Sequence, residues 1–91
     1  MTNKRQLKKS INYICDSLIG ECLAIALYGA NEKKENLIDE TISSILNMQE
    51  DFLSRISHPE PGMSQKKYFA SLKQDFAKSV AEVIDNIRNI A

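Results

Sequence analysis

The chain has 91 residues, which suffice for one domain with a modest core and exclude a second domain. Its 12 basic and 12 acidic residues cancel, so the net charge provides no overall attraction to nucleic acid or anionic lipid. The hydrophobic content of 43% argues against disorder, and the scarcity of glycine (3) and proline (2) favours long helices.

The first predicted helix runs from about residue 4 to residue 28. Asn3 and Gln6 have the spacing of a capping box, and Gly29 stands where a left-handed residue often ends a helix. Apolar residues recur at steps of three and four, which places them on one side of a helix. These residues are Leu7, Ile11, Ile14, Leu18, Cys22 and Ile25.

The second predicted helix covers about residues 32–57, with Asn31 or Asn36 as its N-cap. Its stripe contains one polar member, Gln49, whose amide needs hydrogen-bond partners if it is buried. The apolar members are Ile38, Ile42, Ile45, Phe52 and Ile56.

Both prolines fall in the segment Ser57-His58-Pro59-Glu60-Pro61-Gly62-Met63, which cannot continue a helix. Pro61-Gly62 suits the centre of a type II turn, and the segment is either a stiff connector or a recognition surface. Ser64 is the expected N-cap of a third helix over about residues 65–89, with Met63 and Tyr68 at the positions of a hydrophobic staple. The third stripe is Phe69, Leu72, Phe76, Val80, Val83, Ile87 and Ile90.

Three helices of similar length with short connections predict an all-α fold, an antiparallel up-down-up three-helix bundle that forms a single domain over residues 1–91. Dimerisation would complete this bundle, because the second half of the first helix is apolar nearly all round.

One surface does not fit a lone bundle. Leu23 and Leu27 fall roughly opposite the core stripe, and the small residues Gly20 and Ala24 would let another backbone approach closely. The predicted interface is Tyr13, Gly20, Leu23, Ala24 and Leu27, extended by Leu37 and Met48 of the second helix. Because large apolar patches are uncommon on monomers, we expect a protein partner, either a second copy in a homodimer or a different protein.

The up-down-up order also gathers basic residues at one end of the bundle and an excess of acidic residues at the other. The predicted basic pole is Lys4, Arg5, Lys8, Lys9, Arg55, Lys66 and Lys67. It supports an alternative function, binding of nucleic acid or another polyanion. We disfavour nucleic acid, because arginines are few and most aromatic residues fall on the core stripes.

No catalytic, metal or cofactor motif is present, so the sequence predicts a non-enzymatic protein without a cofactor. His58 is the only histidine, too few for a metal-binding bundle core. Cys15 and Cys22 on one helix lie about 10 Å apart, too far to form a disulfide, and we expect both to be reduced core thiols.

We expect a cytoplasmic protein with no membrane segment. Basic residues precede an apolar stretch at the N-terminus, but Asp16 and Glu21 interrupt that stretch, unlike the core of a signal peptide. An unbroken run of about 20 apolar residues is absent from the sequence.

Three strings resemble those of a family of small uncharacterised bacterial all-helical proteins. They are Ile11-Asn12-Tyr13-Ile14-Cys15, the proline segment from Ser57 to Met63, and Tyr68-Phe69. The resemblance covers nearly the whole chain and implies a cytoplasmic bacterial protein, but it supplies no site residues. The expected function is therefore a helical module for protein interaction or structure.

Overall fold

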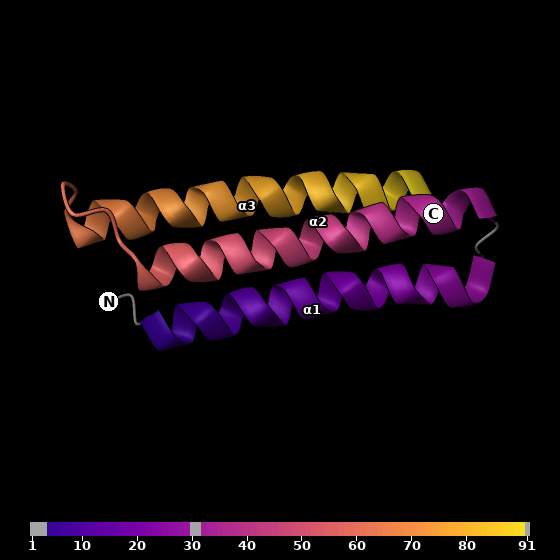
Figure 1. Cartoon of the computed structure of the whole chain (residues 1–91), viewed down its shortest axis with the longest axis horizontal. Helices are drawn as coiled ribbons and strands as arrows, with labels where there is room; N and C mark the ends of the chain where they lie inside the picture. The colour runs from indigo at the N-terminus through magenta and orange to yellow at the C-terminus, as the bar shows by residue number, and fades with distance from the viewer. Residues whose placement is uncertain (1–3, 30–31, 91) are drawn as a thin grey trace.

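The computed structural model describes residues 4–29 and 32–90, which form three α-helices (Figure 1). These are α1 (Lys4–Gly29), α2 (Glu32–Ser57) and α3 (Gln65–Ile90). The described ranges contain no strand, which confirms the all-α prediction, and the helix boundaries match the predicted ones to within one residue. The predicted caps Asn3 and Asn31 lie outside the described residues.

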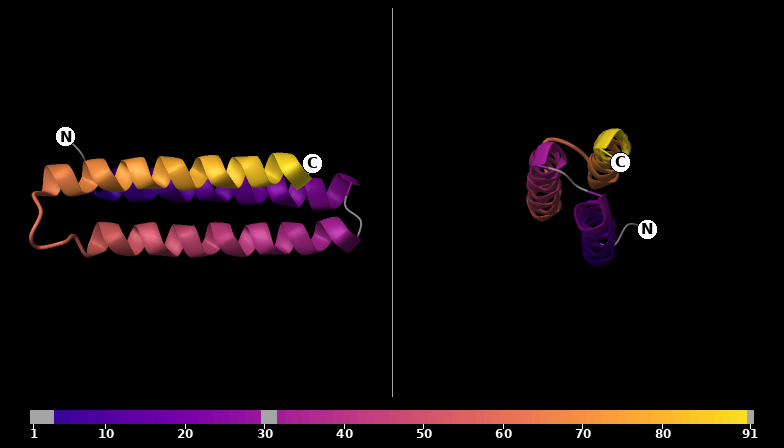
Figure 2. Two further views of the ribbon diagram at one scale, coloured as in Figure 1. Left: turned by 90° about the horizontal axis from the view of Figure 1, so that it is seen from above. Right: turned by 90° about the vertical axis from the view of Figure 1, so that its right-hand side faces the viewer.

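The helices lie side by side in a rod of 48 × 19 × 16 Å (Figure 1). The chain runs up α1, down α2 and up α3, and the end-on view in Figure 2 shows the three axes at the corners of a triangle. α2 packs against both of its neighbours, whereas α1 and α3 contact each other least. Each helix therefore keeps a long side that no other helix covers.

The core consists of the predicted apolar stripes turned towards one another. Its fully buried centre includes Ile11, Cys15, Cys22, Ile45 and Ile56. The remaining buried apolar residues are Leu18, Ile38, Phe52, Phe69, Leu72, Phe76, Val83, Ile87 and Ile90. Within the described part of the chain, no buried side-chain nitrogen or oxygen lacks a hydrogen-bond partner, as a stable helical core requires.

Aromatic packing joins α2 to α3. The rings of Phe52 and Phe76 meet edge to face, with centroids 5.1 Å apart and planes inclined by 74°. Such pairs contribute about 0.5–1.5 kcal/mol beyond the apolar area they bury. This contact joins the C-terminal part of α2 to the middle of α3.

The connection between α2 and α3 follows the predicted cap but not the predicted turn. Ser64 caps α3, because its Oγ accepts a hydrogen bond of 3.3 Å from the backbone N–H of Lys67. The N–H of Met63 donates to the carbonyl of Glu60 over 3.4 Å and closes a β-turn. The predicted type II turn is wrong, because it needs a positive φ at Gly62 and no described residue has one.

The prediction for Gly29 is also wrong. Gly29 is the last residue of α1 and its φ is not positive, so it continues the helix instead of ending it in a left-handed conformation. Ordinary helical backbone extends the helix by one residue beyond the predicted end at residue 28.

Candidate interaction surface

The side of α1 turned away from the core carries large apolar side chains. The opposite side is buried through Ile11 and Cys22, among others. Tyr13 is 75% exposed, Leu27 78% and Leu23 50%. We call these three residues, with the exposed Gly20 and Ala24, the outer face of α1. The structure therefore brings together the five residues of α1 that the sequence predicts as an interface.

Tyr13, Gly20 and Leu27 follow one another at intervals of seven residues along this face. Because seven residues come within about 20° of two full helical turns, the three lie almost on one line. Apart from its chain neighbours and the nearby backbone of α1 itself, a Cβ added at Gly20 would meet no heavy atom of the described residues within 4 Å. Glycine inside a helix destabilises it by about 1 kcal/mol relative to alanine, so packing within one chain does not account for Gly20.

Tyr28 extends the apolar surface to the end of α1 and was not among the predicted interface residues. Its side chain is 87% exposed, and it lines a shallow pocket with Ala24, Ile25 and Lys34. The sequence signal was available, because Tyr28 follows Ala24 by four residues and therefore lies on the same side of the helix.

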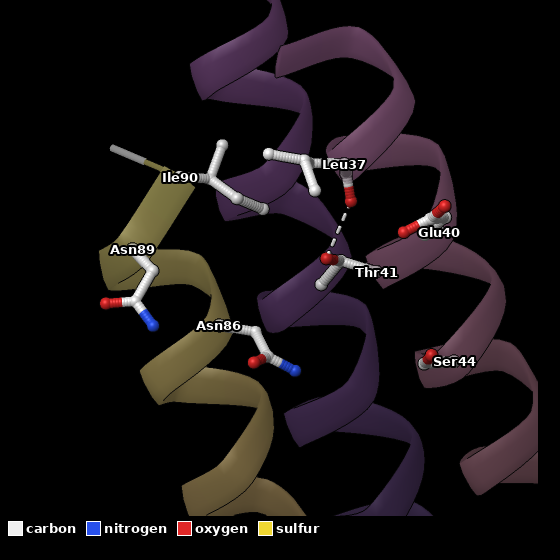
Figure 3. A pocket seen from close by; sticks show the side chains of 7 residues that line it. All are labelled: Leu37, Glu40, Thr41, Ser44, Asn86, Asn89 and Ile90. Atoms are coloured by element: carbon white, nitrogen blue, oxygen red, sulfur yellow. Dashed lines mark hydrogen bonds between the residues drawn. The ribbon is translucent and has the colours of Figure 1, made fainter. Parts of the chain in front are cut away.

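The two residues of α2 predicted to extend the interface do not join the outer face of α1. Met48 is half-buried and packs against the core. Leu37 lines a pocket between α2 and α3, together with Asn86 and Ile90 (Figure 3). Leu37 is 45% exposed beside α3, and the predicted extension of the interface by these two residues stays a prediction.

The Leu37 pocket has a volume of about 260 Å³ and a mixed lining. Figure 3 shows the amides of Asn86 and Asn89 on one wall and Glu40 and Ser44 on the other. The hydroxyl of Thr41 donates to the carbonyl of Leu37 over 2.8 Å, so it is already engaged within its own helix. This lining includes no histidine, cysteine or cationic side chain, and it gives no set of groups for nucleophilic or acid–base catalysis.

The predicted basic pole forms at the end of the bundle where α1 begins, α2 ends and α3 begins (Figure 1). Lys8 is half-buried there. The exposed members of the pole are Lys4, Arg5, Lys9, Arg55, Lys66 and Lys67. Two of its seven members come from α3 and four from α1, so the fold does bring together charges that are distant in sequence.

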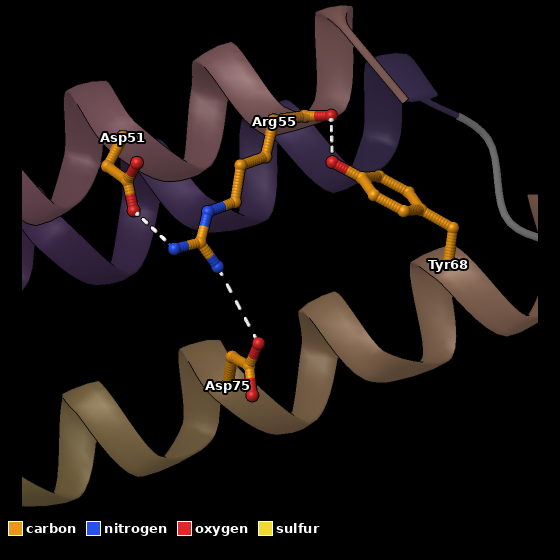
Figure 4. A network of polar contacts seen from close by, with 4 residues as sticks. All are labelled: Asp51, Arg55, Tyr68 and Asp75. Atoms are coloured by element: carbon orange, nitrogen blue, oxygen red, sulfur yellow. Dashed lines mark hydrogen bonds and ion pairs between the residues drawn. The ribbon is translucent and has the colours of Figure 1, made fainter. Parts of the chain in front are cut away.

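Arg55, however, is committed to contacts within the chain (Figure 4). Its guanidinium pairs with Asp51 over 3.0 Å and with Asp75 of α3 over 3.6 Å. The same group lies 4.9 Å from the centre of the Phe52 ring, a cation–π distance. Two carboxylates thus offset its charge, and Arg55 contributes little to the attraction of an external anion.

A neighbouring hydrogen bond ties the same part of α2 to α3. The hydroxyl of Tyr68 donates to the backbone carbonyl of Arg55 over 3.0 Å (Figure 4). This carbonyl belongs to the last turn of α2, where carbonyls lack a partner within the helix. Tyr68 therefore stabilises the end of α2.

Both cysteines are free and buried in α1. Burial raises the pKa of the Cys15 thiol, and the carboxylate of Asp16 raises it further. Burial likewise raises the pKa of the Cys22 thiol, with Glu21 acting in the same direction. A buried thiol with a raised pKa is a poor nucleophile and a poor metal ligand. Among the described residues no group of three or more His, Cys, Asp or Glu side chains is placed to hold a metal ion.

α1 is also long and apolar enough to cross a membrane, judged by length and composition alone. The expectation that the chain contains no membrane segment stays a prediction, because length and composition do not decide it. The core helix of a soluble protein and a signal sequence have the same two properties. In this structure one side of α1 is buried against the rest of the bundle through residues such as Cys15 and Leu18.

Comparisons with known proteins give no match to any family model, curated protein or solved structure. Two surface features of the molecule therefore bear on its function: the outer face of α1 and the basic pole.

Proposed function

We propose that the protein is a non-enzymatic helical interaction module that associates with itself through the outer face of α1. The observation that carries the proposal is the exposure of Tyr13, Leu23 and Leu27 on one side of one helix. Contiguous apolar patches on soluble proteins commonly mark interaction sites. A homodimer is the simplest partner arrangement, because two-fold pairing is the commonest form of assembly.

Removing apolar surface from water would drive this association. Each Å² of apolar surface that is buried contributes about 25 cal/mol, before the entropic cost of association is subtracted. Leu27 is the most exposed leucine of the outer face and lies near the middle of its width. Association would therefore remove more apolar surface from water at Leu27 than at Leu23.

The test compares the unmodified chain with two variants, each substituted at one leucine, by sedimentation velocity at high micromolar concentration. We expect the unmodified chain to sediment as a dimer and Leu27→Asp as a monomer. The substitution removes the most exposed leucine of the outer face and adds a second carboxylate to the one that Asp16 already places on this side of α1. Leu46→Asp is the matched control, since Leu46 is 49% exposed on α2, outside the outer face of α1. Equal sedimentation of Leu27→Asp and the unmodified chain contradicts the proposal, as does equal dissociation of both variants.

Polyanion binding through the basic pole is the second candidate. The observation that favours it is the gathering of exposed lysines from two helices, including Lys4, Lys66 and Lys67. Binding to phosphate or sulfate groups should weaken steeply as salt rises. Retention on heparin at low salt that is lost in a Lys66→Glu/Lys67→Glu variant supports this candidate. Absence of retention at low salt removes it.

The proposal places the protein in a reducing compartment, the cytoplasm. Its support is the pair of free, buried thiols of Cys15 and Cys22. Fractionation of the native cells with an antibody to the chain tests this placement. Recovery in the membrane fraction would instead favour α1 as a membrane segment.

A further inference from the structure

We infer that two copies of this chain pair antiparallel through α1, with Gly20 at the crossing point and the Tyr13 of each copy against the Leu27 of the other. This inference rests on the proposed self-association and adds the orientation and register of the two copies. Three independent features of the structure support it: the spacing of the exposed residues, the open space at Gly20 and the distribution of charge.

The spacing supports a two-fold axis at Gly20. Tyr13 and Leu27 each lie seven residues from Gly20, on opposite sides of it along the helix. A two-fold rotation that reverses the direction of α1 at Gly20 therefore exchanges the positions of Tyr13 and Leu27. Of the three large side chains of the outer face these are the two most exposed, so one operation covers both. An isologous contact of this kind is what closed dimers use.

Gly20 supplies the close approach that such a crossing needs. A Cβ at this position would meet no heavy atom of the described residues within 4 Å, so the space above Gly20 is open in the single chain. Ala24, one turn further on, is also small and exposed. Two helices that cross at small residues can bring their backbones close together and increase the packing of the larger side chains on either side.

The charge distribution selects the antiparallel orientation. Exposed lysines gather at the start of α1 and α3, including Lys4, Lys9 and Lys66. At the opposite end of the bundle, exposed acidic residues outnumber the basic residues Lys34 and Arg88. The acidic residues are Glu35, Asp39, Glu40, Glu82 and Asp85. Antiparallel pairing puts the basic end of one copy beside the acidic end of the other, whereas parallel pairing would juxtapose like charges.

Disulfide trapping tests the orientation directly. Tyr13→Cys and Leu27→Cys are made separately, one with an affinity tag, and mixed under mild oxidation. The buried native thiols of Cys15 and Cys22 stay in place, and mass spectrometry verifies that they are unmodified. In the antiparallel pair the two Tyr13 positions lie about 21 Å apart along the helices, too far for a disulfide, whereas Tyr13 faces Leu27. Gln74→Cys, on the exposed side of α3, mixed with Leu27→Cys provides the control for random collision.

The inference predicts that the mixed Tyr13→Cys/Leu27→Cys disulfide forms at least several-fold faster than either homologous disulfide and than the control. Faster formation of the homologous pairs contradicts the antiparallel orientation and leaves self-association standing. A dimer in sedimentation that gives no trapped product above the control contradicts the inference in the same way. A chain that stays monomeric overturns both this inference and the proposed function. Binding of that monomer to phosphatidylcholine vesicles would show that the outer face of α1 contacts a membrane instead of a second copy.

Discussion

The side-chain amide of Gln49 donates a hydrogen bond of 2.7 Å to the Oδ1 atom of Asn12 and thereby links α2 to α1. Both residues are half-buried between the two helices. A polar pair inside an otherwise apolar interface fixes the relative positions of the helices, because any shift along the axis leaves an amide without its partner. The polar member of the second stripe is thus satisfied by a residue 37 positions earlier in the chain.

Asn12→Ala should lower the free energy of unfolding by about 1 kcal/mol, because it removes the acceptor and leaves the Gln49 amide partly desolvated. The double variant Asn12→Leu/Gln49→Leu should recover much of the loss, since no amide then lacks a partner. Urea unfolding of Asn12→Leu, Gln49→Leu and the double variant measures the coupling. Strict additivity of the two substitutions would show that the hydrogen bond has no energetic role.

The centre of the core should be far more sensitive than the adjacent surface. Ile45 is fully buried, and its neighbour Leu46 is 49% exposed. Ile45→Ala should cost about 2–5 kcal/mol through lost burial and the cavity left behind. Leu46→Ala should stay within about 0.5 kcal/mol, as is usual for surface positions. Thermal unfolding followed by circular dichroism gives both values, and similar losses at the two positions would contradict the packing described.

The buried thiols should make the fold sensitive to alkali. Burial raises the pKa of Cys15 and of Cys22 in the folded chain. The unfolded thiols ionise near pH 8.5, so stability from these groups is complete below about pH 8.5. That stability is lost as the pH rises from there through the folded pKa values. The free energy of unfolding should therefore begin to fall as the pH rises above about 8.5 and continue to fall through the raised folded pKa values, and it should fall less in a Cys15→Ala/Cys22→Ala variant. Parallel declines in the two proteins would contradict this assignment.

Gly20→Ala should have opposite effects on the stability of the single chain and on the association of two chains. The exposed position has room for a Cβ within its own chain, so the monomer should gain about 0.5–1 kcal/mol in stability. The same methyl group should weaken the dimer, because it fills the space through which the second backbone approaches. Unfolding at low concentration and sedimentation at high concentration measure the two effects. A variant with tighter association would show that the helices do not cross at Gly20.

Sequence patterns predicted the helices, the core stripes and the exposed residues of α1, because each depends on periodicity within one helix. Contacts that depend on how two helices are placed were not predicted. The pairing of Arg55 with Asp75 needs the register of α2 against α3, and the position of Met48 needs the rotation of α2. The predicted positive φ at Gly29 and Gly62 was also wrong, because glycine permits a positive φ without requiring one.

The mass of the unmodified chain in solution, measured by light scattering across a range of concentrations, tests the central claim most directly. One chain has a mass of 10.3 kDa. If two copies associate through the outer face of α1, the measured mass should rise to twice that value at high concentration. A mass that remains that of a single chain at every concentration contradicts the claim that the outer face of α1 serves self-association.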